Sequence, residues 1–220
     1  MEIVDHKARL IGGLIIMAIL TGILSVVPAI DSAKYLNEAA GKLNQTMTGA
    51  FFQFLMASIY LAIAALLYPI LEKHGKSLAI GFLAMRIIAA TLVIFGTIML
   101  SSLLALSQEF VQSPSRNPYM FEVLGDIIKV ARDHTNHGYM ILALCGGNIL
   151  MYVLLIKSRM VPFWISAWGL LGVLLSAAAS VLILFQVFDV ISAQYLALNA
   201  PTALVEIVFA LWLLVKGFET

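Results

Sequence analysis

The stretch SLAIGFLAMRIIAATLVIFGTIMLSSLLAL, residues 77–106, decides the fold of this chain, because it is long, apolar and interrupted by one charge, Arg86. A helix that crosses a bilayer needs about 20 mostly apolar residues, and this stretch exceeds that length. A charged side chain inside such a span is costly unless it faces the interior of a helix bundle. The stretch therefore predicts a transmembrane helix with one polar side turned toward other helices.

The composition of the whole chain agrees with this interpretation. Of the 220 residues, 62% are hydrophobic and only 11% are charged, and the mean hydropathy is +1.00. Soluble domains carry roughly 25% charged residues, so we expect an integral membrane protein surrounded by membrane lipids. The net charge of +1 and the lack of a long basic run exclude a nucleic-acid partner, which would require clustered Lys and Arg.

Apolar runs of sufficient length predict six transmembrane helices and an all-α polytopic fold, with residues 1–220 forming a single domain. The predicted spans cover residues 9–27, 49–71, 77–106, 138–156, 162–188 and 193–214. The first apolar run is about 18 residues long, which is longer than the 7–15 residues of a signal peptide, and we therefore interpret it as a span.

The distribution of cationic residues predicts the orientation. One side of the bundle would carry Lys7, Arg9, Lys73, Lys76, Lys157, Arg159 and Lys216, and the other Lys34, Lys42, Arg116, Lys129 and Arg132. Cytoplasmic loops are enriched in Lys and Arg. The larger set therefore predicts that the N- and C-termini are cytoplasmic.

The two longer outer connections are predicted to form short amphipathic helices. In residues 117–133, Asn117 can cap a helix and Pro118 suits its first position, while apolar and charged residues separate onto two faces. We expect this helix to lie flat on the membrane surface. Residues 31–44 repeat the pattern more weakly. Both segments are predicted to be lids over the bundle, with a gate over a pocket as the alternative.

Three strongly polar residues in three different spans share one depth. At 1.5 Å per residue, Arg86 lies roughly 13 Å from the cytoplasmic end of its span, Glu206 about 15 Å from Lys216, and Asn148 about 14 Å from Lys157. Each charge would be costly against lipid, so we predict an ion pair between Arg86 and Glu206. Asn148 is expected to accept a further hydrogen bond from the guanidinium.

Helical periodicity extends this cluster toward the outer surface. In several spans, polar residues recur on one face of the helix and form a stripe that runs from the cluster to the outer end. The predicted ligand-binding residues are Arg86, Glu206, Asn148, Thr97, Ser101, Gln53, Tyr60, Thr202 and His137. Converging polar stripes suit a pocket that opens outward. They also suit hydrogen bonding between helices without any ligand, and the sequence leaves both interpretations open.

No motif in the sequence indicates a cofactor or a metal. Asp133, His134 and His137 have a spacing that could hold a metal, but no second pair of ligands matches them, so helix capping is the preferred interpretation and no metal is predicted. No nucleophile elbow, HExxH motif or Walker loop is present, and we expect no cofactor.

Small residues at steps of four in the fifth span, Gly172, Ser176 and Ser180, predict close helix packing. Small-residue faces of this kind also suit contact with a second copy of the chain. A homo-oligomer is therefore one expectation.

Three segments resemble a known family. They are YPILEKHGKSLAIGFLAMRII at residues 68–88, LSQEFV at 106–111 and SRMVPFWISAWGLLG at 158–172. They are similar to a prokaryotic multi-pass membrane family known as domain of unknown function 4386. The resemblance implies six spans and a location in a prokaryotic cytoplasmic membrane, and it brings no established activity. Members of that family often carry an acid shortly after the arginine of the third span, where this chain has Ala89 and Ala90.

These observations together predict a protein that binds or transports a small amphipathic or anionic molecule in a polar pocket opening outward. Two alternatives remain. An intramembrane hydrolase-like enzyme would use Glu206 or His137 as a general base and would need a nucleophile or metal within reach. A structural or sensory protein would instead bind another membrane protein.

Overall fold

The computed structural model describes residues 2–113, 117–190 and 192–219, with side chains from residue 6 onward, and this part of the chain is all-α. Its long helices are α1 (Glu2–Leu24), α4 (Leu43–Leu71), α5 (Lys76–Gln112), α6 (Pro118–Asp133), α7 (Met140–Ser158), α8 (Phe163–Leu184) and α9 (Ala193–Val215). Among the described residues, six helices are long and apolar enough to cross a membrane, where α6 and α7 count as one. The predicted all-α polytopic fold with six spans is confirmed.

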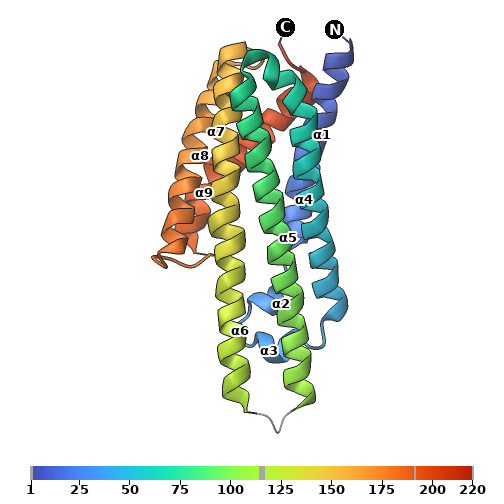
Figure 1. Cartoon of the computed structure of the whole chain (residues 1–220), viewed down its shortest axis with the longest axis vertical. Helices are drawn as coiled ribbons and strands as arrows, with labels where there is room; N and C mark the ends of the chain where they lie inside the picture. The colour runs from blue at the N-terminus through green and yellow to red at the C-terminus, as the bar shows by residue number, and fades with distance from the viewer. Residues whose placement is uncertain (1, 114–116, 191, 220) are drawn as a thin grey trace.

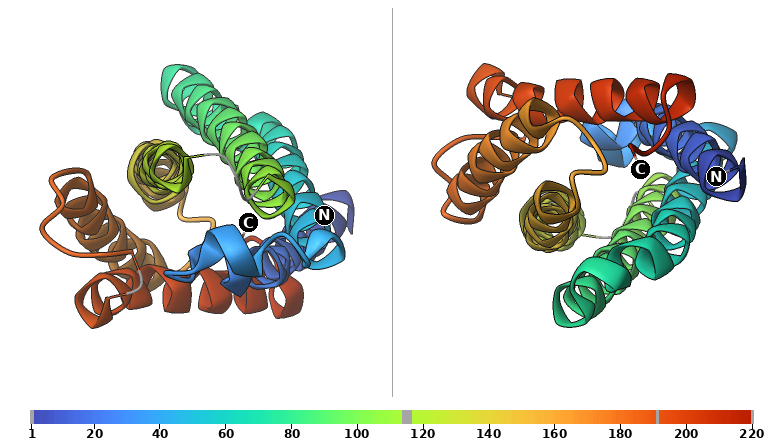
Figure 2. Two further views of the ribbon diagram at one scale, coloured as in Figure 1. Left: turned by 90° about the horizontal axis from the view of Figure 1, so that it is seen from below. Right: turned by 90° about the horizontal axis from the view of Figure 1, so that it is seen from above.

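The six spans form a closed ring around a common axis (Figure 2). Each packs against its two neighbours in the order α1, α4, α5, α7, α8, α9 and back to α1. The start of α1 and the end of α9 lie at the same end of the bundle (Figure 1). We call this end the terminal end and the opposite one the distal end. A ring of six helices leaves an axial region that only inward-facing side chains can fill.

Turns at the terminal end are short and have clear chemical causes. After α4, the single turn η1 (Glu72–His74) ends at Gly75. After α7, Arg159 adopts a left-handed backbone with φ of 55°, and Pro162 precedes the first residue of α8. A left-handed residue and a proline both stop helix propagation, so α7 and α8 reverse direction within a few residues.

Helix α5 is longer than a bilayer is thick. Its 37 residues span about 55 Å at 1.5 Å per residue, compared with a hydrocarbon core of about 30 Å. The extra length projects from the distal end, where α6 runs beside it (Figure 1). As predicted, Asn117 caps α6 by accepting a hydrogen bond from the backbone N–H of Tyr119, and Pro118 occupies the first turn.

The prediction that residues 117–133 lie flat on the membrane surface is wrong. Helix α6 continues through a π-helical turn, η2 (His134–Tyr139), into α7, which gives one helix over Pro118–Ser158 (Figure 1). The sequence pattern misleads here because the charged face of α6, with Lys129 and Arg132, contacts the protein. The apolar face is turned outward, and Ile127 is 61% exposed.

The connection between α1 and α4 contains two short helices, α2 (Pro28–Asp31) and α3 (Tyr35–Glu38), in place of the single weak helix expected over residues 31–44. They lie across the distal end of the bundle, beside α5 and α6 (Figures 1 and 2). Ile30 and Leu36 are buried in one cluster with Leu103 and Phe121, so this connection caps the bundle. Arg116, which entered the prediction of orientation, lies outside the described residues.

Candidate functional site

A buried polar bridge joins three helices near the middle of the bundle. The guanidinium Nη2 of Arg86 on α5 donates to the amide oxygen of Asn148 on α7 at 2.5 Å. The amide nitrogen of Asn148 donates to Oε1 of Glu206 on α9 at 3.5 Å. Arg86 and Asn148 are only 6% and 3% exposed, so both groups are removed from lipid and from water.

The sequence predicts that Arg86, Asn148 and Glu206 meet at one depth, and the structure brings them together. The predicted direct ion pair is wrong, because no ion pair within 4 Å joins Arg86 and Glu206 in the described part of the chain. The amide of Asn148 lies between the two charges, since its oxygen accepts from one and its nitrogen donates to the other.

The remaining contacts of Arg86 are aromatic. Its guanidinium carbon lies 5.7 Å from the ring centre of Tyr60 and 5.4 Å from that of Phe82, which are distances typical of cation–π contacts. The Nε–H of Arg86 is buried and has no hydrogen-bond partner among the described residues. A buried donor without a partner is costly, so the guanidinium is held in place with one of its hydrogen bonds unmade.

The bridge forms part of the wall of a cavity of about 140 Å³, which we call the deep cavity. Arg86, Asn148, Glu206, Tyr60 and Tyr152 supply its polar groups. The other lining residues are apolar or glycine: Ile15, Ala18, Ile19, Gly22, Met56, Ile63, Leu67, Met151 and Phe209. The deep cavity is therefore an apolar space with a cation, an anion and two phenols on its surface.

A second cavity of about 240 Å³ lies toward the distal end, and we call it the distal cavity. Its polar lining comes from α4, α6, η2 and the α1–α4 connection, which supply Gln53, Arg132, Asn136, His137, Ser25 and Asp31. Two residues, Gly22 and Met56, line both cavities. The two cavities are therefore neighbours that meet at this pair.

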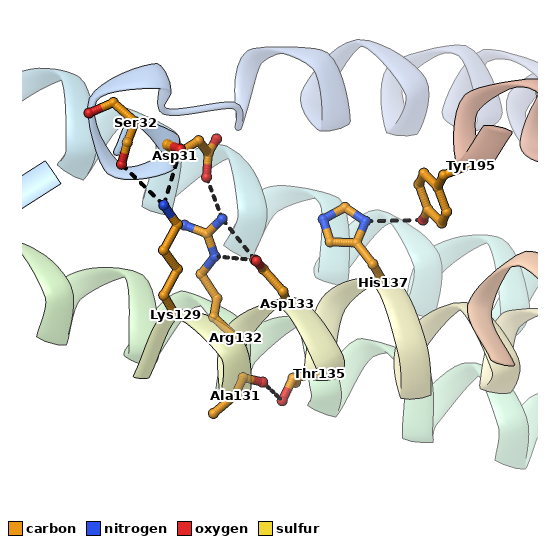
Figure 3. Close-up of polar contacts among 9 residues, drawn as sticks. All are labelled: Asp31, Ser32, Lys129, Ala131, Arg132, Asp133, Thr135, His137 and Tyr195. Carbon is orange, nitrogen blue, oxygen red and sulfur yellow. Dashed lines mark hydrogen bonds and ion pairs between the residues drawn. The ribbon is translucent and has the colours of Figure 1, made fainter. Parts of the chain in front are cut away.

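An ionic network includes Asp31 and Arg132, two residues that line the distal cavity (Figure 3). The guanidinium of Arg132 contacts the carboxylates of Asp31 and Asp133, and its Nε donates to Asp133 at 3.2 Å. The Nζ of Lys129 donates to the backbone oxygens of Asp31 and Ser32, at 3.1 Å in each case. These contacts fasten the α1–α4 connection to the end of α6.

Tyr35 adds a further contact between α3 and α6. Its hydroxyl donates to the carboxylate of Asp126 at 3.3 Å, and Lys129 lies 5.1 Å from the centre of its ring. Burial, with the nearby negative charge of Asp126, raises the pKa of Tyr35 to about 12. The hydroxyl therefore stays protonated at neutral pH and remains a donor.

The other predicted site residues divide between the cavity walls and the helix interfaces. Gln53 lines the distal cavity and accepts a hydrogen bond from Thr97 at 2.9 Å, which links α4 to α5. Ser101 donates to the backbone oxygen of Thr97, within its own helix. Among the described residues, Thr97 and Ser101 line neither cavity. The bond from Thr97 joins two helices, whereas that of Ser101 stays within α5.

Thr202 also belongs to a helix interface. Its hydroxyl lies 2.7 Å from that of Ser176, and a Cβ on Gly172 would lie 3.0 Å from the backbone nitrogen of Thr202. The close packing predicted for the small residues of the fifth span is confirmed, and α9 covers this face within the chain.

His137 lines the distal cavity, and its Nδ1 lies 3.1 Å from the hydroxyl of Tyr195 on α9 (Figure 3). Asp133, which the sequence places beside it as a metal-ligand candidate, contacts Arg132 instead. Within the described residues, no group of three His, Cys, Asp or Glu side chains could hold a metal ion.

The sequence did not predict Arg132 and Asp31 as partners or Met56 as a lining residue. A signal existed for the first pair, because opposite charges at the inner ends of the two long outer connections can meet when both connections fold over the same opening. No signal in the sequence distinguishes Met56 from ordinary core residues.

The fold and the buried bridge define a six-span integral membrane protein with charged groups in the wall of an internal cavity. Residues 10–217 match the family described as Domain of unknown function (DUF4386), and the chain belongs to this family. No curated protein and no solved structure matches the chain.

Proposed function

We propose that this protein binds or transports a small amphipathic or anionic molecule, and that the deep cavity holds it. The observation that carries the proposal is the buried guanidinium of Arg86 in the wall of an otherwise largely apolar cavity, where its direct hydrogen-bond partner is the neutral amide of Asn148. Intramembrane charges of this kind commonly mark substrate pathways. Carboxylates and phosphates are the groups that a guanidinium binds best.

The size and lining of the deep cavity suggest the ligand class. A cavity of about 140 Å³ is close to an engineered apolar cavity of about 150 Å³ that holds benzene. The acidic group of an amphipathic ligand and the first part of its alkyl chain fit this space, and a longer chain such as that of octanoate would extend into the neighbouring distal cavity. The acidic group would accept from Arg86, and the first part of the alkyl chain would contact Ile63, Leu67 and Phe209.

The first experiment measures octanoate binding to purified protein in detergent micelles, followed as ligand-induced thermal stabilisation and by direct binding of radiolabelled octanoate. We expect saturable binding to the wild type, and its loss in Arg86→Met. Ser176→Ala is the matched control, because it removes a polar group inside the bundle but outside both cavities. Equal octanoate binding by the wild type and a folded Arg86→Met protein would contradict the proposal.

Arg86→Lys keeps the positive charge, so it tests the role of the guanidinium even if Arg86→Met fails to fold. Lys retains the cation but loses the planar guanidinium, so we expect octanoate binding weaker than that of the wild type and stronger than that of Arg86→Met. Elution volume in gel filtration shows whether each variant is folded before its binding is compared.

The enzyme alternative has less support. Among the described residues, the lining of the deep cavity contains no Ser, Thr or Cys that could act as a nucleophile beside Glu206. In the distal cavity, His137 contacts the hydroxyl of Tyr195, which orients the ring toward a helix interface.

For orientation, we propose that the terminal end is cytoplasmic and that the host membrane is a prokaryotic cytoplasmic membrane. The excess of Lys and Arg in the short connections at that end supports this proposal. A fluorescent protein fused after Lys216 should fluoresce, and alkaline phosphatase fused at the same place should be inactive. The reverse result would contradict the orientation and place the distal cavity on the cytoplasmic side.

A further inference from the structure

The deep and distal cavities meet at one narrow place. Gly22 on α1 and Met56 on α4 are the two residues that line both cavities. A Cβ placed on Gly22 would lie 3.4 Å from the sulfur of Met56, and no other heavy atom of the described neighbours lies within 4 Å of it. We call Gly22 and Met56 the neck.

Close helix packing does not explain the glycine at position 22. A Cβ on Gly12 would lie 2.7 Å from the backbone oxygen of Ala210, so that glycine lets α1 approach α9. The single neighbour of Gly22 is the end of a flexible thioether side chain. The space left by Gly22 therefore belongs to the cavities, and Met56 can move to widen it.

We infer that the distal cavity is the entry route to Arg86 and that the neck controls passage between the two cavities. This inference rests on the proposed function. An amphipathic molecule needs both polar and apolar contacts along its route, and the residues that line the two cavities supply them. Gln53 and His137 offer polar contacts in the distal cavity, Val93 and Ile141 add apolar wall, and the neck leads to the guanidinium.

Filling the neck tests the route. Gly22→Val adds an isopropyl group where the side chain of Met56 already lies in contact distance, which narrows the passage. Gly13→Val is the matched control, because it makes the same change on the same helix at a position with nothing within 4 Å. The measurement is the initial rate of radiolabelled octanoate binding to purified protein.

We expect Gly22→Val to slow octanoate association by about tenfold or more, because a closed route makes binding wait for a rearrangement. Gly13→Val should bind at the wild-type rate. Equal rates in Gly22→Val and the wild type would overturn the inference. If the wild type itself binds no octanoate, the proposed function fails, and the next experiment still tests the route.

Thiol labelling tests the route without any ligand. The single cysteine, Cys145, is buried and is first removed by Cys145→Ala. In that background, a charged membrane-impermeant methanethiosulfonate should modify both Val26→Cys, which lines the distal cavity, and Met56→Cys at the neck. Gly22→Val should slow the modification of Met56→Cys.

Octanoate protection connects the two experiments, since bound octanoate should slow the modification of Met56→Cys and leave that of Val26→Cys nearly unchanged. Failure of the reagent to modify Met56→Cys, under conditions in which it modifies Val26→Cys, would overturn the route. That result would leave the octanoate binding site at Arg86 unaffected.

Discussion

Arg86 donates to Asn148 across 2.5 Å in the centre of the bundle, and this neutral amide, rather than a carboxylate, is the direct partner of the buried cation. The arrangement spreads one positive and one negative charge over three helices, because the other end of the same amide donates to Glu206. The stability of the ring should therefore depend on the amide as well as on the charges.

Replacing the amide with an apolar side chain of similar size should destabilise the protein. Asn148→Leu leaves Arg86 and Glu206 without their shared partner, and an unsatisfied buried polar group costs about 1–3 kcal/mol. Thermal unfolding in micelles measures the loss. The control is Thr91→Val, since Thr91 is exposed on α5 and bonds only within its own helix. Equal melting temperatures for both variants would rule out a structural role for the bridge.

Removing the acid should destabilise the protein more than removing the base. In Glu206→Ala, the guanidinium of Arg86 loses its counter-charge and cannot shed a proton at any accessible pH. In Arg86→Ala, the carboxylate of Glu206 can take up a proton and become neutral. Thermal unfolding of the two variants, compared under the same conditions, should rank them in that order. Identical losses would mean that the two charges do not interact.

At the α8–α9 interface, a larger side chain should destabilise the protein more than the loss of a hydrogen bond. Gly172→Val places methyl groups against the backbone of Thr202, and overpacking of this kind costs about 1–3 kcal/mol. Thr202→Val removes only the hydrogen bond to Ser176, for which about 0.6 kcal/mol is typical in membranes. Thermal unfolding gives both values, and octanoate binding should persist in Thr202→Val. Loss of binding in that variant would place Thr202 in the site after all.

The ionic network at the distal end should depend on the shape of the guanidinium. Arg132→Ala removes contacts to two carboxylates and should cost about 1–3 kcal/mol, because the hydrogen bonds involve charged groups. Arg132→Lys keeps the charge but cannot bridge both acids in the same way, so it should lie between Arg132→Ala and the wild type. Limited proteolysis within residues 31–44 measures how firmly the connection is held. An unchanged cleavage rate in Arg132→Ala would show that the network does not fasten it.

Much of the membrane-spanning region was predictable, because hydropathy and length report directly on burial in lipid. The six spans and the common depth of Arg86, Asn148 and Glu206 follow from residue counting along helices with a fixed rise. The bridging position of Asn148 did not follow, since helix rotation and side-chain reach decide which of three neighbouring groups lies between the others.

The distal end was predicted less well. An amphipathic pattern over residues 117–133 is typical of a helix on a bilayer surface, yet it cannot show whether the charged face meets water or protein. Here the partners of Lys129 and Arg132 lie about 100 residues earlier in the chain. Only the folded chain brings these segments together, and their contacts hold α6 in line with α7.

The π-helical turn at His134–Tyr139 sets the angular phase between the two halves of the longest helix. The half before the turn presents Arg132 to the network, and the half after it presents Asn148 to Arg86. Successive residues of an α-helix are rotated by about 100° about the helix axis. Shortening the π-helical turn by one residue would therefore rotate either Arg132 or Asn148 away from its partners. The π-helical turn thus sets the rotation at which Arg132 and Asn148 both face their partners.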